Sequence, residues 1–184
     1  MSPVVKICGI QDPILADWSF SQGADFVGLV LAPSRRQVSL AQATAMIKAV
    51  PGPYVAVVSS AGRGELEAIL AELAVIAVQY HGSSQWDWIA EVQAKGRLAI
   101  ATELEPRADI VLLDGEEPGR GKVRDWQRPK WNRPVWLAGG LTPLNVGAMV
   151  QALHPDGVDV SSGVERNGVK DRQLISQFIR EAKQ

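Results

Sequence analysis

The sequence is poor in the residues that build disulfide-linked or metal-held frameworks. Among its 184 residues there is one cysteine, Cys8, and there are two histidines, His81 and His154. A lone cysteine excludes an internal disulfide framework and a zinc site of clustered cysteines. Two histidines argue against a multi-histidine metal site, so we expect no bound metal.

The sequence also lacks a surplus of one charge and a long hydrophobic run. Lys and Arg total 19 against 20 Asp and Glu, a net charge of −1, which argues against binding nucleic acid through bulk positive charge. The longest apolar run, residues 26–32, is too short to cross a bilayer, and the first residues carry no signal-peptide pattern. We therefore expect a cytoplasmic protein with neither a membrane nor a nucleic-acid partner.

What is present suits one globular domain over residues 1–184. The length fits one domain better than two, and 46% hydrophobic with 21% charged residues is typical of a folded chain. Short runs rich in Val, Ile and Leu alternate with helix-like stretches, as in parallel strands covered by helices. The predicted strands are Val4–Cys8, Phe26–Leu31, Tyr54–Ser59, Ala77–His81, Leu98–Thr102, Asp109–Asp114, Val135–Ala138 and Val158–Ser161.

Helix start signals lie between these strands. A capping side chain, in two cases followed by proline, predicts the beginning of a helix. The signals are Asp12-Pro13, Ser39, Ser84 and Thr142-Pro143. Apolar residues at helical spacing predict a last helix over Arg172–Lys183.

Eight strands in this rhythm predict a compact (β/α)8 TIM barrel, with an open doubly wound sheet as the alternative. Such barrels usually run about 250 residues, so this chain is short for one. Residues 103–108 leave no room for a full helix, so we expect the helix between strands five and six to be shortened or missing. The stretch 115–134, interrupted by proline and glycine, predicts a second short or absent helix.

Four polar residues lie at the carboxyl ends of predicted strands: Cys8, His81, Asp114 and Ser161. Alternate strand residues face opposite sides, so these side chains point into the barrel if the apolar set faces the helices. The carboxyl ends of the strands form the catalytic face of such a barrel. Each residue also has a plainer interpretation: Cys8 as a small buried hydrophobe, Asp114 as a cap or turn residue, and His81 as a loop residue.

Two glycine-containing loops follow the seventh and eighth strands. They contain Gly139-Gly140 and Ser161-Ser162-Gly163. Backbone N–H groups of such loops bind anions, and a phosphate held after strands seven and eight recurs in these barrels. Plain turns are the alternative.

Two arginines, Arg35 and Arg36, follow the second predicted strand. A guanidinium meets a carboxylate through two parallel hydrogen bonds, so the pair is a candidate anion clamp. A solvated basic pair is the plainer interpretation.

Several motifs carry a resemblance that runs in order from residue 4 to about residue 180. They are Lys6-Ile7-Cys8-Gly9-Ile10, Gln79-Tyr80-His81-Gly82, Leu112-Leu113-Asp114, residues 137–146, residues 158–165 and Gly168-Val169-Lys170-Asp171. Together they resemble the phosphoribosylanthranilate isomerase family of tryptophan biosynthesis.

The resemblance implies a (β/α)8 barrel without a cofactor, whose partner is a small phosphorylated substrate and which is a monomer or homodimer. It implies an Amadori rearrangement of N-(5-phosphoribosyl)anthranilate to 1-(2-carboxyphenylamino)-1-deoxyribulose 5-phosphate. Cys8 matches the family's general base, Asp114 its general acid and Arg36 the arginine that meets the anthranilate carboxylate. The predicted substrate-binding residues are Arg36, His81, Gly139, Gly140, Ser161, Ser162 and Gly163, and the last five match the family's phosphate site.

The implied chemistry sets conditions on both catalytic side chains. Opening the furanose ring needs an acid near the ring oxygen, so Asp114 must hold a proton when it acts. Removing the C2 proton needs a base, and a free thiol is only a few per cent ionised near neutral pH. Lys6, on the same side of its strand as Cys8, is expected to favour the thiolate.

The chain departs from the family in two segments. Arg120 replaces a small hydroxyl residue and either helps to hold an anion or is solvated, and residues 103–108 are shortened. Two rival functions stay open: another phosphosugar isomerase barrel, and a non-catalytic phosphate-binding barrel. Relatives acting on histidine intermediates use paired aspartates, so Cys8 favours the anthranilate substrate.

Overall fold

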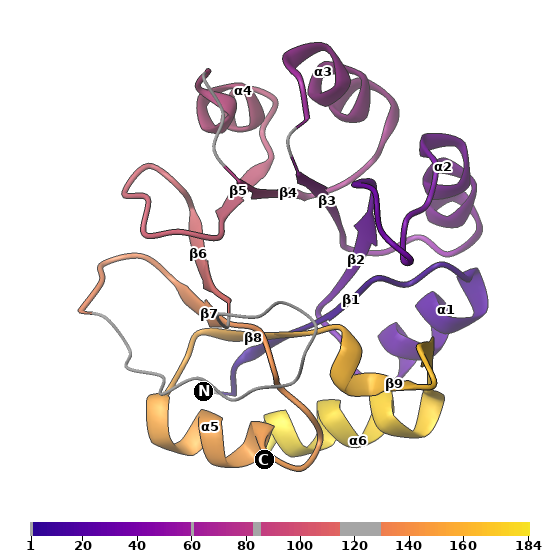
Figure 1. The fold of residues 1–184 in the computed structure, drawn as a ribbon, viewed down its shortest axis with the longest axis vertical. Helices are drawn as coiled ribbons and strands as arrows, with labels where there is room; N and C mark the ends of the chain where they lie inside the picture. The colour runs from indigo at the N-terminus through magenta and orange to yellow at the C-terminus, as the bar shows by residue number, and fades with distance from the viewer. Residues whose placement is uncertain (1, 60, 83–85, 115–129) are drawn as a thin grey trace.

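The computed structural model describes residues 2–59, 61–82, 86–114 and 130–184. Eight parallel strands close into a barrel in sequence order (Figure 1). The predicted TIM barrel is confirmed, and the alternative of an open sheet is wrong. The strands are β1 (Val4–Cys8), β2 (Phe26–Val30), β3 (Tyr54–Ser59), β4 (Ala77–His81), β5 (Leu98–Ala101), β6 (Ile110–Leu113), β7 (Val135–Leu137) and β8 (Gly157–Val160).

Helices flank most of the barrel, and a short hairpin follows β8. The helices are α1 (Pro13–Ser21), α2 (Leu40–Ala49), α3 (Arg63–Glu72), α4 (Trp88–Ala94), α5 (Val146–Leu153) and α6 (Arg172–Lys183). A 3₁₀ turn, η1 (Ser162–Val164), leads into the antiparallel pair β9 (Glu165–Arg166) and β10 (Val169–Lys170).

Two of the predicted helix starts are confirmed. Asp12 accepts a hydrogen bond from the backbone N–H of Ile14 at 2.7 Å, and Pro13 is the first residue of α1. Ser39 and Gln42 form a capping box, in which each side chain bonds the backbone of the other residue. Both arrangements satisfy N–H groups that the first turn of a helix leaves without partners.

The other two starts are wrong. α4 begins at Trp88, with Asp87 as its cap, while Ser84 lies outside the described residues. α5 begins at Val146 because Asn145 holds the preceding residues in a turn. Its side chain accepts from the N–H of Thr142 at 2.7 Å and donates to the carbonyl of Gly140 at 3.0 Å.

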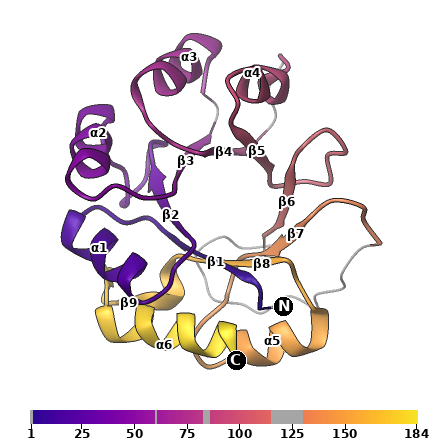
Figure 2. The same ribbon diagram turned by 180° about the vertical axis from the view of Figure 1, so that it is seen from behind.

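One side of the barrel carries no helix in its described part. Residues 102–109 join β5 to β6 without one, which confirms the predicted gap, and residues 130–134 before β7 are not helical either. Figures 1 and 2 show only connecting segments outside β6, whereas α5 and α6 lie next to each other outside β8. The rest of the second predicted gap, including Arg120, lies outside the described residues.

The barrel interior follows the predicted alternation along the strands. Residues of the other parity, such as Val5, Ile7 and Leu29, pack with the helices. Lys6, Gln79 and Asp159 lie buried among the inward-facing side chains. The inward apolar cluster consists of Cys8, Val55, Val57, Ala77, Ile100, Ile110, Leu112, Trp136 and Ala138.

An aspartate directly before a strand ties neighbouring strands together in three places. Each carboxylate accepts from a backbone N–H at 2.8 Å, and the aspartate's own N–H donates to the same residue's carbonyl. The pairs are Asp25 with Val5, Asp109 with Ala99, and Asp156 with Val135. They lie at the amino-terminal end of the barrel, where residues serve stability rather than chemistry.

Candidate active site

A cavity of about 390 Å³ opens at the carboxyl ends of the barrel strands. Its size lies in the range of small-molecule sites. All nine site residues predicted from the sequence line it: Cys8, Arg36, His81, Asp114, Gly139, Gly140, Ser161, Ser162 and Gly163. Within the described part of the chain, no group of three His, Cys, Asp or Glu side chains is arranged to hold a metal ion.

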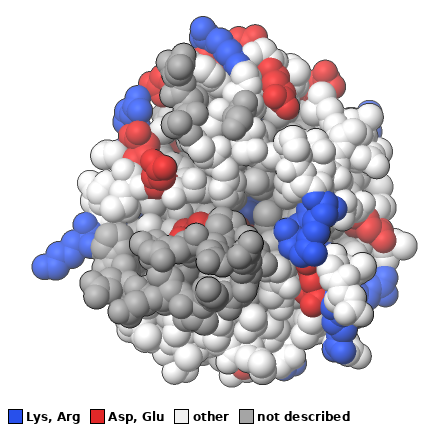
Figure 3. Space-filling view, viewed as in Figure 1, with Lys and Arg blue, Asp and Glu red and all other residues white. Residues whose placement is uncertain are grey.

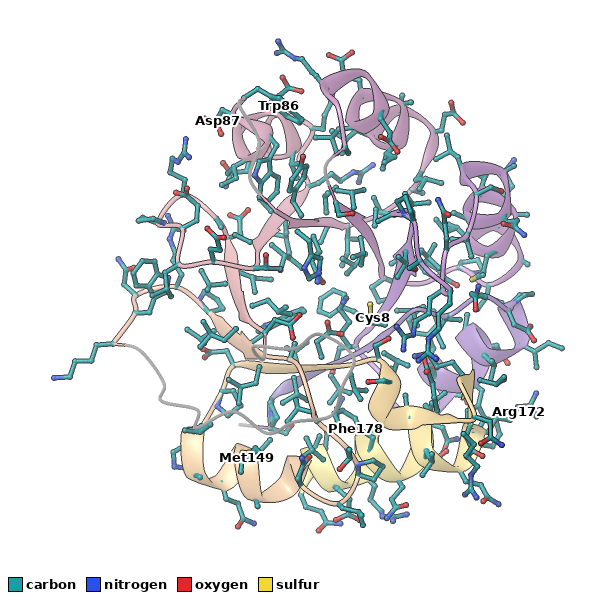
Figure 4. All side chains as sticks on the ribbon, viewed as in Figure 1. Cys8, Trp86, Asp87, Met149, Arg172 and Phe178 are labelled. Atoms are coloured by element: carbon teal, nitrogen blue, oxygen red, sulfur yellow. The ribbon has the colours of Figure 1, made fainter. Side chains whose placement is uncertain are left out.

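Cys8 is the last residue of β1, and its sulfur faces the barrel interior (Figure 4). It is 6% exposed, and burial raises the pKa of its thiol above the ordinary value. The charge of Lys6 lowers the pKa of Cys8, as expected, but burial outweighs it. Cys8 therefore holds its proton more tightly in the folded chain than a free cysteine does.

Lys6 is completely buried beneath Cys8 and carries the central charge of the barrel. Its Nζ donates to Asp159 Oδ2 at 2.9 Å and to Gln79 Oε1 at 2.8 Å. Burial lowers the pKa of Lys6, but the Asp159 carboxylate and Cys8 raise it above its ordinary value overall. Asp159 Oδ1 is buried with no hydrogen-bond partner among the described residues, and its carboxylate raises the pKa of Cys8.

His81 at the end of β4 is joined to this network through Gln79. Because Lys6 can only donate, the Gln79 carbonyl oxygen must face it, and the Gln79 amide nitrogen must donate to His81 Nε2 at 2.8 Å. His81 Nε2 is therefore unprotonated. Burial and then the charge of Lys6 lower the pKa of His81, which agrees with a neutral ring.

Asp114 directly follows β6 and is half-buried. β6 lies across the barrel from β1 and β2 (Figure 1). Cys8 and Asp114 therefore approach the cavity from opposite walls. A ligand in the cavity would have one of the two groups on each side, an arrangement suited to an acid and a base.

The two glycine-containing loops lie against each other at the rim of the cavity. A Cβ on Gly163 would fall 1.8 Å from the carbonyl oxygen of Leu141, so only glycine permits this approach. The side chain of Asn145 fixes Gly140 and Thr142 in the neighbouring loop. The loops after β7 and β8 thus form one backbone-lined surface, typical of a phosphate site.

Arg36 lines the cavity, but its guanidinium already has a carboxylate partner. Nε and Nη2 donate to the two oxygens of Glu165 at 2.6 and 3.0 Å. Arg36 is mostly buried, whereas the side chain of Arg35, which also contacts Glu165, is 58% exposed. Of the basic pair, Arg36 is the one placed to meet a ligand.

Reasoning from the sequence missed the roles of Glu165 and Lys170, which contact each other behind Arg36. Asn167 and Gly168, with φ of 52° and 81°, form the two-residue turn that brings them opposite each other in β9 and β10. An Asn-Gly pair is a strong hairpin signal, so this turn could have been found in the sequence.

Comparison with known proteins gives one consistent result. The model of the N-(5'phosphoribosyl)anthranilate (PRA) isomerase family matches residues 5–181. The chain is 41% identical to the N-(5'-phosphoribosyl)anthranilate isomerase of Lacticaseibacillus casei, over 98% of this chain and 95% of that protein. It is 40% identical to the protein of the same name from Hyphomonas neptunium, over 97% and 96%.

Solved structures agree with the sequence comparisons. The phosphoribosyl anthranilate isomerase of Thermotoga maritima superposes with a TM-score of 0.87 at 32% identity, covering 98% of both chains. That of Thermus thermophilus gives 0.82 at 30% identity, covering 97% of both.

Proposed function

Because the chain belongs to the N-(5'-phosphoribosyl)anthranilate isomerase family, we propose that it rearranges N-(5-phosphoribosyl)anthranilate to 1-(2-carboxyphenylamino)-1-deoxyribulose 5-phosphate in tryptophan biosynthesis. The reaction is an aldose–ketose type isomerisation, an intramolecular oxidoreduction that reduces C1 and oxidises C2 of the sugar. The observation that carries this proposal is that the nine predicted site residues line one cavity.

The catalytic steps are assigned to Asp114 and Cys8. Asp114 donates a proton to the furanose ring oxygen, the C1–O bond breaks, and the nitrogen lone pair forms a C=N bond to C1. The Cys8 thiolate takes the proton from C2, and the electrons of that bond form a C1=C2 enolamine. The enolamine then loses its enol O–H proton to water and takes a proton from water at C1, which gives the aminoketone. Asp114 regains a proton from water and Cys8 releases one to water, so atoms and charge balance.

Binding is assigned to the two rims of the cavity. Arg36 receives the anthranilate carboxylate, and the loops containing Gly139-Gly140 and Ser161-Ser162-Gly163 receive the phosphate. The class of substrate, though not the residue roles, is supported by a phosphoribosyl anthranilate isomerase solved in complex with reduced 1-(o-carboxyphenylamino)-1-deoxyribulose 5-phosphate, 29% identical with a TM-score of 0.79. The chain acts as a monomer or homodimer, and a structural relative from Thermotoga maritima is described as dimeric.

The catalytic roles are tested by following the fluorescence of phosphoribosylanthranilate as it is consumed. Cys8→Ala and Asp114→Ala should each lower kcat by about 10²–10⁴-fold, because each removes one proton-transfer group, while phosphate ligands still bind. Asp17→Ala, at an exposed position of α1, is the matched control and should leave kcat unchanged. Near wild-type turnover in either site variant would overturn its assigned role.

The same assay separates the proposal from its main rival. A wild-type chain that binds phosphate ligands without consuming phosphoribosylanthranilate would be a non-catalytic phosphate-binding barrel. Turnover by the wild type supports the isomerase.

A further inference from the structure

One buried carboxylate beside the cavity holds three cationic side chains. The side chain of Glu165 is 4% exposed. Its Oε1 accepts from Arg36 Nε at 2.6 Å and Lys170 Nζ at 2.9 Å, and its Oε2 accepts from Arg36 Nη2 at 3.0 Å and Arg35 Nη2 at 2.7 Å. Figure 3 shows basic side chains beside the barrel opening, over the β2–α2 connection, with acidic atoms next to them.

Within this group only Arg36 belongs to the cavity wall, whereas Glu165 and Lys170 lie behind it. The backbone at Gly9 supports Arg36 from another direction. Gly9 has a φ of +78°, and a Cβ there would lie 2.5 Å from Cδ of Arg36. The arginine is therefore held on two sides, by the Glu165 carboxylate and by the bare backbone of the loop after β1.

Lys170 connects this arginine to the loop after β8. Its side chain is 5% exposed, and its Nζ donates to the carbonyl oxygen of Ser161 at 2.8 Å as well as to Glu165. Ser161 Oγ in turn donates to the carbonyl of Cys8 at 3.2 Å. One chain of contacts thus links the arginine, the loop after β8 and the end of β1.

The pairing also decides which part of the guanidinium can meet a ligand. A guanidinium presents its donors as a rigid planar fork. Glu165 occupies the edge formed by Nε and Nη2, so Nη1 of this cavity-lining arginine is the terminal nitrogen without a bond to Glu165. Three cations around one carboxylate also leave an excess of positive charge at this rim, which favours an anionic ligand.

We propose that Glu165, held in place by Lys170, is a positioning residue that orients Arg36 toward the carboxylate of the substrate. The inference rests on the proposed function, because it concerns the carboxylate end of that substrate. Glu165 itself touches no substrate and acts only through Arg36. Its loss should therefore weaken binding of the carboxylate without changing the proton-transfer steps.

The central variant is Glu165→Gln, which keeps the shape of the side chain and removes its charge. KM for phosphoribosylanthranilate should rise about 10–100-fold while kcat stays within about 2-fold, because binding is lost equally from substrate and transition state. Glu67→Gln is the matched control, since Glu67 also pairs with an arginine, Arg63, but is 63% exposed. It should change neither constant.

A double variant separates positioning from a general structural effect. In an Arg36→Met background, Glu165→Gln should have no further effect on KM, because the residue through which it acts is gone. The proposal is overturned if the double variant raises KM by the product of the two single-variant factors. It is also overturned if Glu165→Gln lowers kcat by as large a factor as it raises KM. If Glu165→Gln does not fold, Glu165→Asp keeps the charge one methylene short and should raise KM by a smaller factor.

A binding measurement keeps the inference separate from the proposed activity. Wild type and Glu165→Gln are titrated calorimetrically with reduced 1-(2-carboxyphenylamino)-1-deoxyribulose 5-phosphate and with its analogue lacking the carboxyl group. The substitution should weaken binding of the first compound about 10-fold or more and leave the second unchanged. Equal weakening of both, or of neither, contradicts the positioning role even in a chain that shows no turnover, whereas absent turnover alone contradicts only the proposed function.

Discussion

Two sides of the barrel differ both outside and inside. The site side, β8 and β1 to β4, is covered by α1, α2, α3 and α6 and carries the buried charges of Lys6 and Asp159 in its interior. The helix-poor side, residues 98–114 and 130–137, contains no helix, although α4 packs against β5, and its inward side chains apart from Asp114 are apolar. Helices and buried charge are thus concentrated on the same side.

The pairing of the strands follows the same division. β3 and β4 are in register from Val55–Ala77 to Ser59–His81, whereas β5 and β6 pair only at Ile100–Ile110 and Ala101–Val111. A side chain adds to this short pairing. Asp109 accepts from the N–H of Ala99 and from Gln93 of α4, at 2.8 and 3.1 Å.

The difference explains how a short chain keeps the whole cavity. Of the nine predicted site residues, the helix-poor side supplies Asp114, and the loop after its last strand, β7, supplies Gly139 and Gly140. The site side supplies the other six residues and also fixes the buried ion pair of Lys6 and Asp159. The outer helices support the strands that carry this pair.

The largest expected effect concerns the charge inside the site side. Lys6→Met leaves the Asp159 carboxylate buried without its cation, which should lower the free energy of unfolding by about 3–5 kcal/mol. Urea denaturation measures it, with exposed Lys95→Met as the control. Adding Asp159→Asn to Lys6→Met should restore part of the lost stability, because the unpaired charge is removed. Equal free energies of unfolding for Lys6→Met and Lys95→Met would contradict the prediction.

A smaller effect is expected at the aspartate of the helix-poor side. Asp109→Ala removes a charged acceptor from the N–H of Ala99 and should lower the free energy of unfolding by about 1–3 kcal/mol. Hydrogen exchange should show faster exchange confined to β5 and β6, because these two strands pair with each other at only two positions. Asp25→Ala removes the equivalent acceptor from Val5 on the site side and is the comparison. If Asp25→Ala speeds exchange only in β1 and β2, then local opening occurs as readily on the site side as on the helix-poor side, and the two sides do not differ in this respect.

The smallest effect is a shift in the titration of Cys8, read from the thiolate absorbance of this single cysteine. Burial raises its pKa, so half-ionisation should fall above the ordinary value of about 8.5. Lys6→Met should move the midpoint higher and Asp159→Asn lower, since the first removes a positive and the second a negative charge. Because the folded thiol keeps its proton more tightly, stability should decline as pH rises through this range. A midpoint at or below 8.5 contradicts the account of the site.

The sequence predicts the strands better than the helix starts, for a physical reason. Every strand begins and ends within one residue of its predicted bounds. A strand buried on both faces is a continuous run of apolar residues, so the run in the sequence directly marks the strand. A cap signal is shorter and competes with tertiary contacts. Thr142 fails as a helix start because Asn145 binds its backbone first.

The candidate site divides in a similar way. Position along a strand and parity bring Cys8, His81, Asp114 and Ser161 to one cavity. Neither reveals that Arg36 is paired with Glu165, since that contact spans 129 positions of sequence. The pKa of Cys8 likewise depends on how far burial raises it and how far the charge of Lys6 lowers it. Both effects come from the packing of the barrel interior, which no local sequence pattern reveals.

The aspartates that precede β2, β6 and β8 reinforce particular strand pairs. Each one joins an odd-numbered strand to the even-numbered strand after it, through both side chain and backbone. β5–β6 and β7–β8 are in register at only two residue pairs each, whereas β3–β4 is in register at five and carries no such aspartate. The aspartates thus act as splints that lengthen the bonding of short strand pairs.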